Sequence, residues 1–231
     1  MIIYNPDFDG EEFVFENEWD TAIPVNFRII DGEVTVSYFP RIESKIKTWA
    51  TEHEADLFSD SALQALWSLL KDDIAEWGYE EEPHRERWGH ILRTNKAHLQ
   101  SNCILDSTVR MRAEDEDRND TSYDIEMSLS DGCAAFGTVC EGRITSIAVT
   151  HNDFEDADIV EIGVETCKGM RGKGMASSNL AALSDYLLSR GVIPEYRCFF
   201  TNEASRKTAM KAGFFSVGKY YYYVLRRKAN T

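Results

Sequence analysis

A glycine-rich turn between an apolar run and an amphipathic helix is the part of this sequence best suited to chemistry. The run over residues 158–165 is rich in Ile and Val and predicts a β-strand. Residues 168–174 then contain three glycines, and a helix follows with apolar residues at 176, 180, 183 and 187 before Gly191. Backbone N–H groups of such a loop and the positive end of the helix converge, so the sequence predicts an anion site.

Two nucleotide-binding motifs do not fit this loop. A Walker A loop needs Ser or Thr directly after Gly-Lys, but Gly174 follows Lys173. The dinucleotide fingerprint needs a third glycine where Ser177 stands. The run from Arg171 to Ala176 instead resembles the acetyl-CoA pyrophosphate loop of the GNAT N-acetyltransferase superfamily. Residues 161–166 look like the fourth strand of that family.

A second block downstream strengthens the resemblance. Asn202 is followed by Ser205 and then by Lys211, Gly213 and Phe214, as in the superfamily, and the similarity covers residues 120–225. It implies an α/β (α+β) fold class, the GNAT acyltransferase fold, whose mixed central sheet is splayed between its fourth and fifth strands. We therefore expect a GNAT acetyltransferase domain over 101–231 and a small α+β N-terminal domain of unknown role over 1–100.

The resemblance also assigns residues to acetyl-CoA, the co-substrate of the family. Backbone groups of Val164 and Thr166 would pair with the pantetheine arm, the loop N–H groups would hold the pyrophosphate, and Asn202 would contact the pantetheine. Glycine at 172 and 174 leaves room for the backbone to approach the phosphates. The implied acetyl-CoA residues are Val164, Glu165, Thr166, Arg171, Gly172, Lys173, Gly174, Met175, Ala176, Asn202 and Ser205.

Acetyl transfer to an amine needs a base that takes a proton from the acceptor. Three acids lie on or beside the predicted strand, namely Asp158, Glu161 and Glu165. Glu161 is the preferred base, because it lies three residues before Val164, and Asp158 is the second choice. The apolar neighbours of Glu161 should raise its pKa towards neutrality by desolvation. An exposed or salt-bridged strand carboxylate without a catalytic role is the alternative.

The departing CoA thiolate needs a proton donor, and here the sequence departs from the family. The usual acid is a tyrosine at the position that Ala209 occupies. Tyr220 and Tyr222, on one face of a predicted final strand, are candidate substitutes, although such aromatic residues more often only pack. Among the histidines, His151 alone lies just before the strand predicted over 158–165, and it merits a test. No histidine has metal-ligand spacing, so no metal is expected.

The composition limits the partners. The net charge is −15 over 231 residues, but it is unevenly distributed. The basic part, from Ile159 onward, contains 12 basic and 5 acidic residues, and the acidic part is residues 1–158. The basic part suits a ligand with several phosphates. The acidic part argues against nucleic acid and permits a cationic acceptor, although solubility alone also explains it. No apolar run approaches the roughly 20 residues that span a membrane.

The cysteine count indicates the compartment. Five cysteines, an odd number without a C-x-x-C pair, predict reduced thiols in the cytoplasm. The acidic N-terminus is unlike a signal peptide. We expect a monomer or a homodimer.

The leading hypothesis is an acetyl-CoA-dependent N-acetyltransferase that moves acetyl to a primary amine of a small molecule by direct transfer in a ternary complex. One alternative is a non-catalytic, CoA-binding regulatory module, which Ala209 favours slightly. Another is a protein N-acetyltransferase. The intact cofactor strand with Glu161 and Thr166 favours an enzyme.

The remaining pattern predicts further elements. Asp31-Gly32 and Glu141-Gly142 predict two hairpins, and Ser59 or Asp60 caps a helix that ends at Gly78. Other predicted elements are helices over 41–58 and 84–95, strands over 13–15, 104–111 and 123–129, and an exposed charged loop over 114–120.

Overall fold

The computed structural model describes residues 1–17, 19–82, 86–155 and 157–228. The chain forms two compact units, residues 1–88 with 219–231, and residues 89–218. The sequence analysis predicts one domain boundary, between residues 100 and 101. The two compact units are instead divided after residue 88 and again after residue 218. The reason is that the C-terminal strand pairs with strands from the start of the chain, a long-range pairing that no local pattern reveals.

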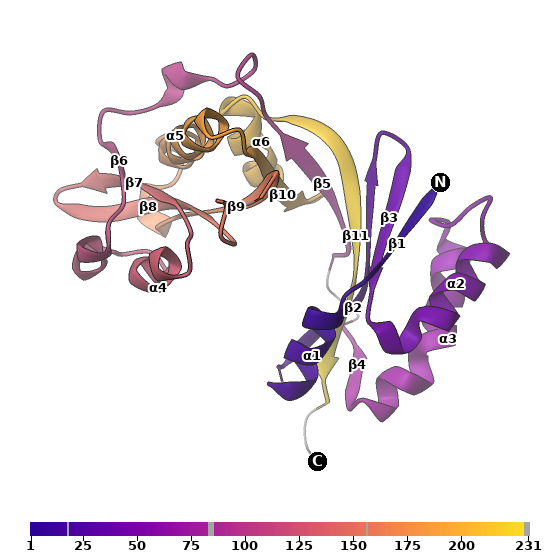
Figure 1. Cartoon of the computed structure of the whole chain (residues 1–231). Coiled ribbons are helices and arrows are strands. Elements are labelled where there is room, and N and C mark those ends of the chain that lie inside the picture. The colour runs from indigo at the N-terminus through magenta and orange to yellow at the C-terminus, as the bar shows by residue number, and fades with distance from the viewer. Residues whose placement is uncertain (18, 83–85, 156, 229–231) are drawn as a thin grey trace. The chain divides into compact units, whose positions relative to one another are not determined.

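The first unit is a sheet with helices (Figure 1). Its strands follow the order β1, β3, β2 and the C-terminal part of β11, with β4 paired to β11. The strands are β1 (Ile2–Pro6), β2 (Thr21–Ile30), β3 (Glu33–Tyr38), β4 (Tyr79–Glu81) and β11 (Phe215–Arg227). The helices are α1 (Phe8–Glu16), η1 (Pro40–Ile42), α2 (Glu43–Glu52) and α3 (Asp60–Glu76). Asp31 and Gly32 have φ of 51° and 81°, which confirms the predicted hairpin turn.

Helix α3 follows the sequence prediction closely. The Ser59 hydroxyl accepts a hydrogen bond from the N–H of Ala62 and caps the helix, and Gly78 beyond its end has φ of 81°. Leu66 and Leu70 are fully buried in the core of this unit. The periodic apolar residues therefore predicted both the helix and the face that it buries.

The second unit holds a mixed sheet with the order β5, β10, β9, β8, β7, β6. Only β9 and β10 run parallel among its described pairs. The strands are β5 (Trp88–Arg93), β6 (Thr108–Arg110), β7 (Ala135–Cys140), β8 (Arg143–Thr150), β9 (Ile159–Thr166) and β10 (Ile193–Phe199). The helices are η2 (Ser101–Cys103), η3 (Ala113–Arg118), α4 (Ile125–Ser130), η4 (Lys168–Met170), α5 (Met175–Ser189) and α6 (Glu203–Lys211). The predicted mixed α/β fold is confirmed.

Several local predictions were wrong. Residues 88–93 form a strand rather than a helix, because they pair with β10, and His84 lies outside the described residues. Residues 125–130 form a helix instead of a strand, since Asp124 caps it through the N–H of Met127. Residues 13–15 lie in α1, and only 108–110 of the strand predicted over 104–111 form one. The charged loop over 114–120 is largely η3, in which Asp115 is buried against Arg118.

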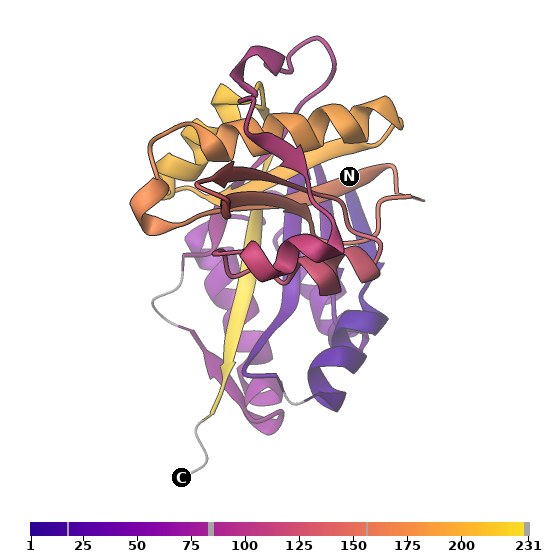
Figure 2. The same ribbon diagram turned by 90° about the vertical axis from the view of Figure 1, so that its left-hand side faces the viewer.

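Two helices cover opposite faces of the second sheet, as Figures 1 and 2 both show. Helix α5 packs with Ile162 and Val164 of β9 on one face, and α4 packs through Ile125 on the other. Because side chains alternate along a strand, Glu161, Gly163 and Glu165 project to the α4 face. The acidic side chains of β9 therefore lie on the α4 face, and its buried apolar side chains lie on the α5 face.

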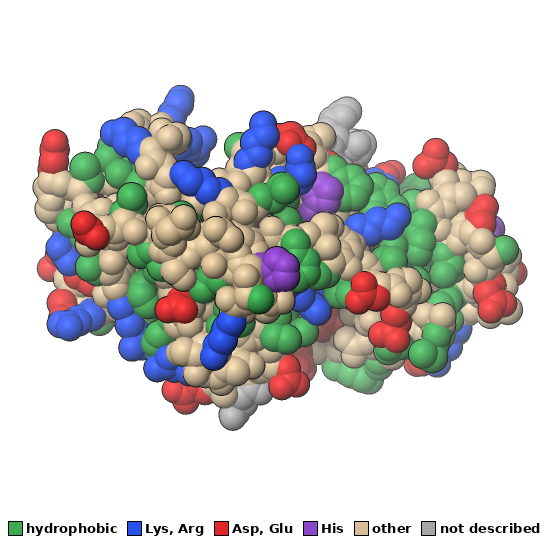
Figure 3. Space-filling view, turned by 90° about the horizontal axis from the view of Figure 1, so that it is seen from above, with side chains coloured by type: hydrophobic (Ala, Val, Ile, Leu, Met, Phe, Trp, Pro, Cys, Tyr) green, Lys and Arg blue, Asp and Glu red, His purple; other side chains and the backbone are tan. Residues whose placement is uncertain are grey.

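The surface of the molecule carries both signs of charge. On the face in Figure 3, basic and acidic side chains are interspersed, and the described residues show no continuous basic stripe there. Among the described residues, no helix combines the length and apolar character needed to cross a membrane.

A buried polar network ties α5 to the second sheet. Asn179 is fully buried, and its Oδ1 accepts from Thr138 Oγ1 at 2.6 Å and Thr108 Oγ1 at 3.2 Å. Its Nδ2 donates to Ser146 Oγ at 3.0 Å, and Ser146 in turn contacts Thr166 Oγ1 at 2.7 Å. This network links the helix that follows the glycine loop to β6, β7, β8 and β9.

The network gives a stability prediction. Asn179→Ala leaves buried hydroxyls without a partner and should lower the free energy of unfolding by roughly 2–4 kcal/mol. Ser184→Ala is the matched control on the same helix, because the buried Ser184 hydroxyl has no partner among the described residues. Chemical denaturation of both variants checks this. Equal losses would mean that the Asn179 hydrogen bonds do not carry the effect.

Candidate active site

The two parallel strands of the second unit separate after three residue pairs. Ile193–Glu195 of β10 lies opposite Ile159–Glu161 of β9. Beyond this point β9 stays paired with β8 up to Thr166, while β10 stays paired with β5 up to Phe199. A fork therefore opens between the strands (Figure 1), at the place where the resemblance predicts a splay.

The backbone of β9 along the fork presents hydrogen-bonding groups to the opening. His151 N donates to Glu161 O, and Cys167 N donates to Thr145 O, so the odd-numbered residues of β9 bond to β8. In an antiparallel ladder the bonding direction alternates, and Val164 and Thr166 therefore direct their N–H and C=O groups towards the fork. The Thr166 carbonyl accepts from Arg171 Nε at 3.2 Å. These are the two residues that the sequence assigns to pantetheine.

The glycine loop lies at the carboxyl end of β9 and leads directly into α5. Gly172 and Gly174 have φ of 79° and 85°, a region that favours glycine, and Gly174 is the N-cap of α5. The first N–H groups of the helix have no partner within it, and the helix dipole adds positive potential. The predicted anion site thus has the backbone geometry that it needs.

A cavity of about 490 Å³ connects the loop with the fork. We call it the fork cavity, and its lining residues are Val164, Glu165, Thr166, Met170, Arg171, Gly172, Gly174, Met175, Ala176, Ser177, Tyr196, Asn202, Ala204, Ser205, Lys207, Thr208 and Lys211. Its cations come from the loop and from α6. The Lys211 ammonium lies so near the loop that a Cβ on Gly174 would be 3.2 Å from Nζ. Such a cavity suits an extended ligand with phosphates at one end.

Glu161 stands at the base of the fork in a charged environment. Its Oε2 lies 3.0 Å from Arg197 Nη1, and its Oε1 lies 3.8 Å from His151 Nδ1. Arg197 Nε also donates to Glu195 Oε1 at 2.8 Å, and the almost fully buried Glu195 accepts from Arg93. The apolar surroundings expected from the neighbouring Ile and Val residues are therefore absent, because cross-strand partners on β10 supply charge.

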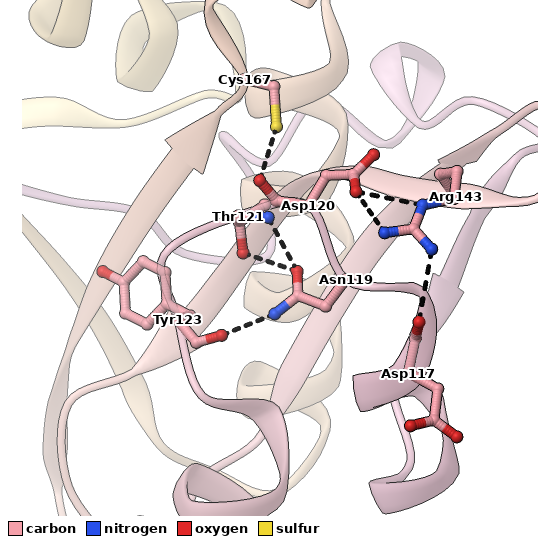
Figure 4. A network of polar contacts seen from close by, with 7 residues as sticks. All are labelled: Asp117, Asn119, Asp120, Thr121, Tyr123, Arg143 and Cys167. Carbon is pink, nitrogen blue, oxygen red and sulfur yellow. Dashed lines mark hydrogen bonds and ion pairs between the residues drawn. The ribbon is translucent and has the colours of Figure 1, made fainter.

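A short loop over residues 119–124 covers the acidic face of β9, and Figure 4 shows its polar contacts. Asp120 forms an ion pair with Arg143, and its backbone carbonyl accepts from Cys167 Sγ at 3.2 Å. The neighbouring Ser122 donates to Glu165 Oε2 through its N–H at 2.9 Å and its hydroxyl at 2.6 Å. This loop therefore uses the Glu165 carboxylate as an anchor, which leaves Glu161 as the strand acid at the fork.

Tyr196 is the hydroxyl-bearing side chain that β10 supplies to the fork cavity. It follows directly after the last residue paired with β9, and its Oη lies 2.6 Å from Ser205 Oγ. Burial raises the pKa of Tyr196, and the hydrogen bond to Ser205 partly offsets that rise. The phenol therefore keeps its proton at neutral pH and is able to donate it.

Residues 132–223 match the family model of the GNAT acetyltransferase. We call these residues the GNAT domain. They span both the fork and the glycine loop. No curated protein has a sequence that matches this chain.

Solved structures show the same fold as the GNAT domain. A protein described as a GNAT-family acetyltransferase from Novosphingobium aromaticivorans is similar with a TM-score of 0.52 and 16% identity, over 66% of this chain and 69% of its own. A GNAT acetyltransferase from Colwellia psychrerythraea has a TM-score of 0.51 and 14% identity, over 89% and 81%. A Drosophila protein has a TM-score of 0.52 and 13% identity, over 84% and 70%. At these identities the likeness concerns the fold alone.

The GNAT domain brings most of the predicted acetyl-CoA residues together. Ten of the eleven line the fork cavity, whereas Lys173 does not and contacts Met170 instead. Tyr196, Lys207 and Lys211 line the cavity but were not predicted as site residues. The closing Lys-x-Gly-Phe block was a signal for Lys211. Tyr196 had no such signal, because its position in the cavity depends on where β10 leaves β9.

The predicted catalytic residues do not all lie at the fork. Glu161 lies at the fork, and Asp158 is exposed before the start of β9. Tyr220 and Tyr222 belong to the first unit, where their rings stack at 4.4 Å. Among the described residues no group of three or more His, Cys, Asp or Glu side chains is arranged to hold a metal ion.

The loop geometry predicts how a phosphate ligand responds to a bulky side chain. Gly174→Val should weaken acetyl-CoA binding at least tenfold, about 1.4 kcal/mol, because the new side chain meets Lys211 and blocks the loop N–H groups. Calorimetry measures this. Gly191→Val is the matched control, since Gly191 has the same φ of 85° past the other end of α5, with open space around its Cβ position. Equal binding by both variants would contradict the phosphate assignment.

Proposed function

We propose that this protein transfers the acetyl group of acetyl-CoA to a primary amine of a small molecule, directly and in a ternary complex. The observation that carries the proposal is the fork between β9 and β10, with the glycine loop at its open end and Glu161 at its base. A site of this form holds a long ligand by its phosphates and delivers its far end to a carboxylate.

The dimensions of the fork suit acetyl-CoA. The loop N–H groups of Gly172 to Ala176 would hold the pyrophosphate, with the ammonium of Lys211 beside them. Val164 would pair with the pantetheine arm. From Thr166 to Ile162 the strand extends about 13 Å, so the acyl end of the arm would reach the base of the fork. When bound, acetyl-CoA supplies the acyl group as an activated thioester.

The chain provides groups for both proton transfers. Glu161 drives proton removal from the acceptor amine, either directly or through a group that touches it. At the other side of the fork, Tyr196 donates its hydroxyl proton to the leaving sulfur, and the contact with Ser205 orients that hydroxyl. Tyr196 thereby takes the role that Ala209 cannot fill. A cytoplasmic setting agrees with this chemistry and with the described cysteines, all of which are free thiols.

An amine panel tests the function itself. Calorimetry should detect acetyl-CoA binding, and a free-thiol assay should detect CoA release only when a suitable small amine is present. Binding without release for any amine would favour a regulatory CoA-binding module. Release only with peptide amines would favour a protein N-acetyltransferase.

A carboxamide substitution tests Glu161. Glu161→Gln keeps the shape of the side chain but removes its charge, so kcat should fall by about 10²-fold or more while acetyl-CoA affinity stays nearly unchanged. Asp158→Asn is the control on the same strand and should retain its activity. If only Asp158→Asn is impaired, the choice of carboxylate is wrong.

Phenylalanine substitutions distinguish the candidate proton donors. Tyr196→Phe should lower kcat by about 10–100-fold and retain the ring contact with Phe214, because only the hydroxyl is lost. Turnover by the wild type should decline once the pH passes the raised pKa of Tyr196, and this decline should disappear in the variant. Tyr220→Phe and Tyr222→Phe measure the alternative from the sequence. A large loss in either, with Tyr196→Phe unaffected, would reverse the assignment.

A further inference from the structure

The carboxylate at the base of the fork is a poor candidate for accepting the proton itself. Arg197 holds one Glu161 oxygen at 3.0 Å and is in turn fixed by the buried Glu195. The guanidinium therefore occupies Oε2 and leaves Oε1 as the carboxylate oxygen that a neighbouring group can approach. The same pairing fixes the direction in which the other oxygen points, and that direction is towards His151.

His151 is placed to use that second oxygen. Its backbone N–H donates to the Glu161 carbonyl at 2.9 Å, which fixes the two residues as neighbours across β8 and β9. Its Nδ1 lies 3.8 Å from Glu161 Oε1, and the side chain is 44% exposed. Catalytic hydrogen bonds are often this long before substrate binds. A small rotation of either side chain would close the contact.

Gly163 permits the other imidazole nitrogen to lie against β9. A Cβ on Gly163 would be 2.4 Å from His151 Nε2 and 2.0 Å from Tyr123 Oη. Any larger residue would therefore displace both side chains. Burial raises the pKa of Tyr123, and the nearby Glu165, Tyr196 and Glu161 raise it further, so its hydroxyl lies within electrostatic range of the fork cavity.

His151 and Tyr123 also line a second cavity, of about 300 Å³, which we call the His151 cavity. The carboxylates of Asp131 and Asp153 belong to the same lining. They are the other charged groups of that lining, whereas Glu161 and Arg197 face the imidazole from β9 and β10. The space thus combines a proton acceptor, a hydroxyl and negative charge, which together suit a cationic amine.

We propose that the acceptor amine binds in the His151 cavity and that His151 Nε2 takes its proton, with Glu161 as a positioning residue. The inference rests on the proposed function. As the amine nitrogen bonds to the acetyl carbon, the carbon–sulfur bond breaks. The nitrogen proton moves to Nε2, and the leaving thiolate receives a proton from Tyr196. The Nδ1–H then points at Glu161, whose charge stabilises the imidazolium. Imidazole is the side chain whose unperturbed proton exchange falls between pH 5 and 8.

Chemical rescue tests this assignment. His151→Ala should lower kcat by about 10²-fold with unchanged acetyl-CoA affinity, and added imidazole should restore part of the activity. Glu161→Gln should also lose activity, but imidazole should not restore it. His98→Ala is the control, because His98 is an exposed histidine of the same unit that bonds to Asn95.

The outcomes separate the inference from the function on which it rests. A wild type that acetylates no amine contradicts the proposed function. An active wild type with full activity in His151→Ala and a loss in Glu161→Gln shows that the carboxylate acts alone and overturns the inference. Should His151→Ala fail to fold, His151→Gln takes its place. A fall in kcat at unchanged acetyl-CoA affinity then supports the inference, and unchanged kcat overturns it.

Discussion

The site depends on one constraint, which is that β9 and β10 pair for only three residues and then separate. Separation leaves backbone N–H and C=O groups of β9 pointing into a cavity instead of into a neighbouring strand. Such groups are costly to leave without partners, so the strand is ready to bind an extended ligand that supplies them. Each strand keeps its other partner, β8 for β9 and β5 for β10, and this second pairing holds the fork open.

The charges at the base of the fork explain why the strands join there. Arg93, Glu195, Arg197 and Glu161 alternate in sign across three neighbouring strands, and Glu195 is only 1% exposed. Buried ion pairs often add little net stability, because desolvation offsets their attraction, but they penalise any other register. Their effect here is to fix the place where pairing stops and the orientation of the Glu161 carboxylate.

Local features of the site could be predicted because their physical causes are local. The glycine loop before α5, the Ser59 cap of α3 and the hairpin at Glu141-Gly142 each depend on a few consecutive residues. The same reasoning failed where pairing between distant segments decided the element. Residues 88–93 form a strand because they pair with β10. Residues 125–130 form a helix because the Asp124 N-cap outweighs the alternation of apolar and polar residues.

The glycine spacing predicts an anion-binding loop, and the apolar periodicity predicts the strand and the helix that flank it. The mixed α/β fold is implied by the resemblance that these residues and the downstream block carry. The surroundings of the proposed catalytic groups depend instead on how distant segments pair. Tyr196 reaches the cavity because β10 diverges from β9, and His151 faces Glu161 because the register of β8 and β9 places them opposite each other. Burial, ion pairing and close approach are properties of segments that meet in space, and a one-dimensional pattern does not contain them.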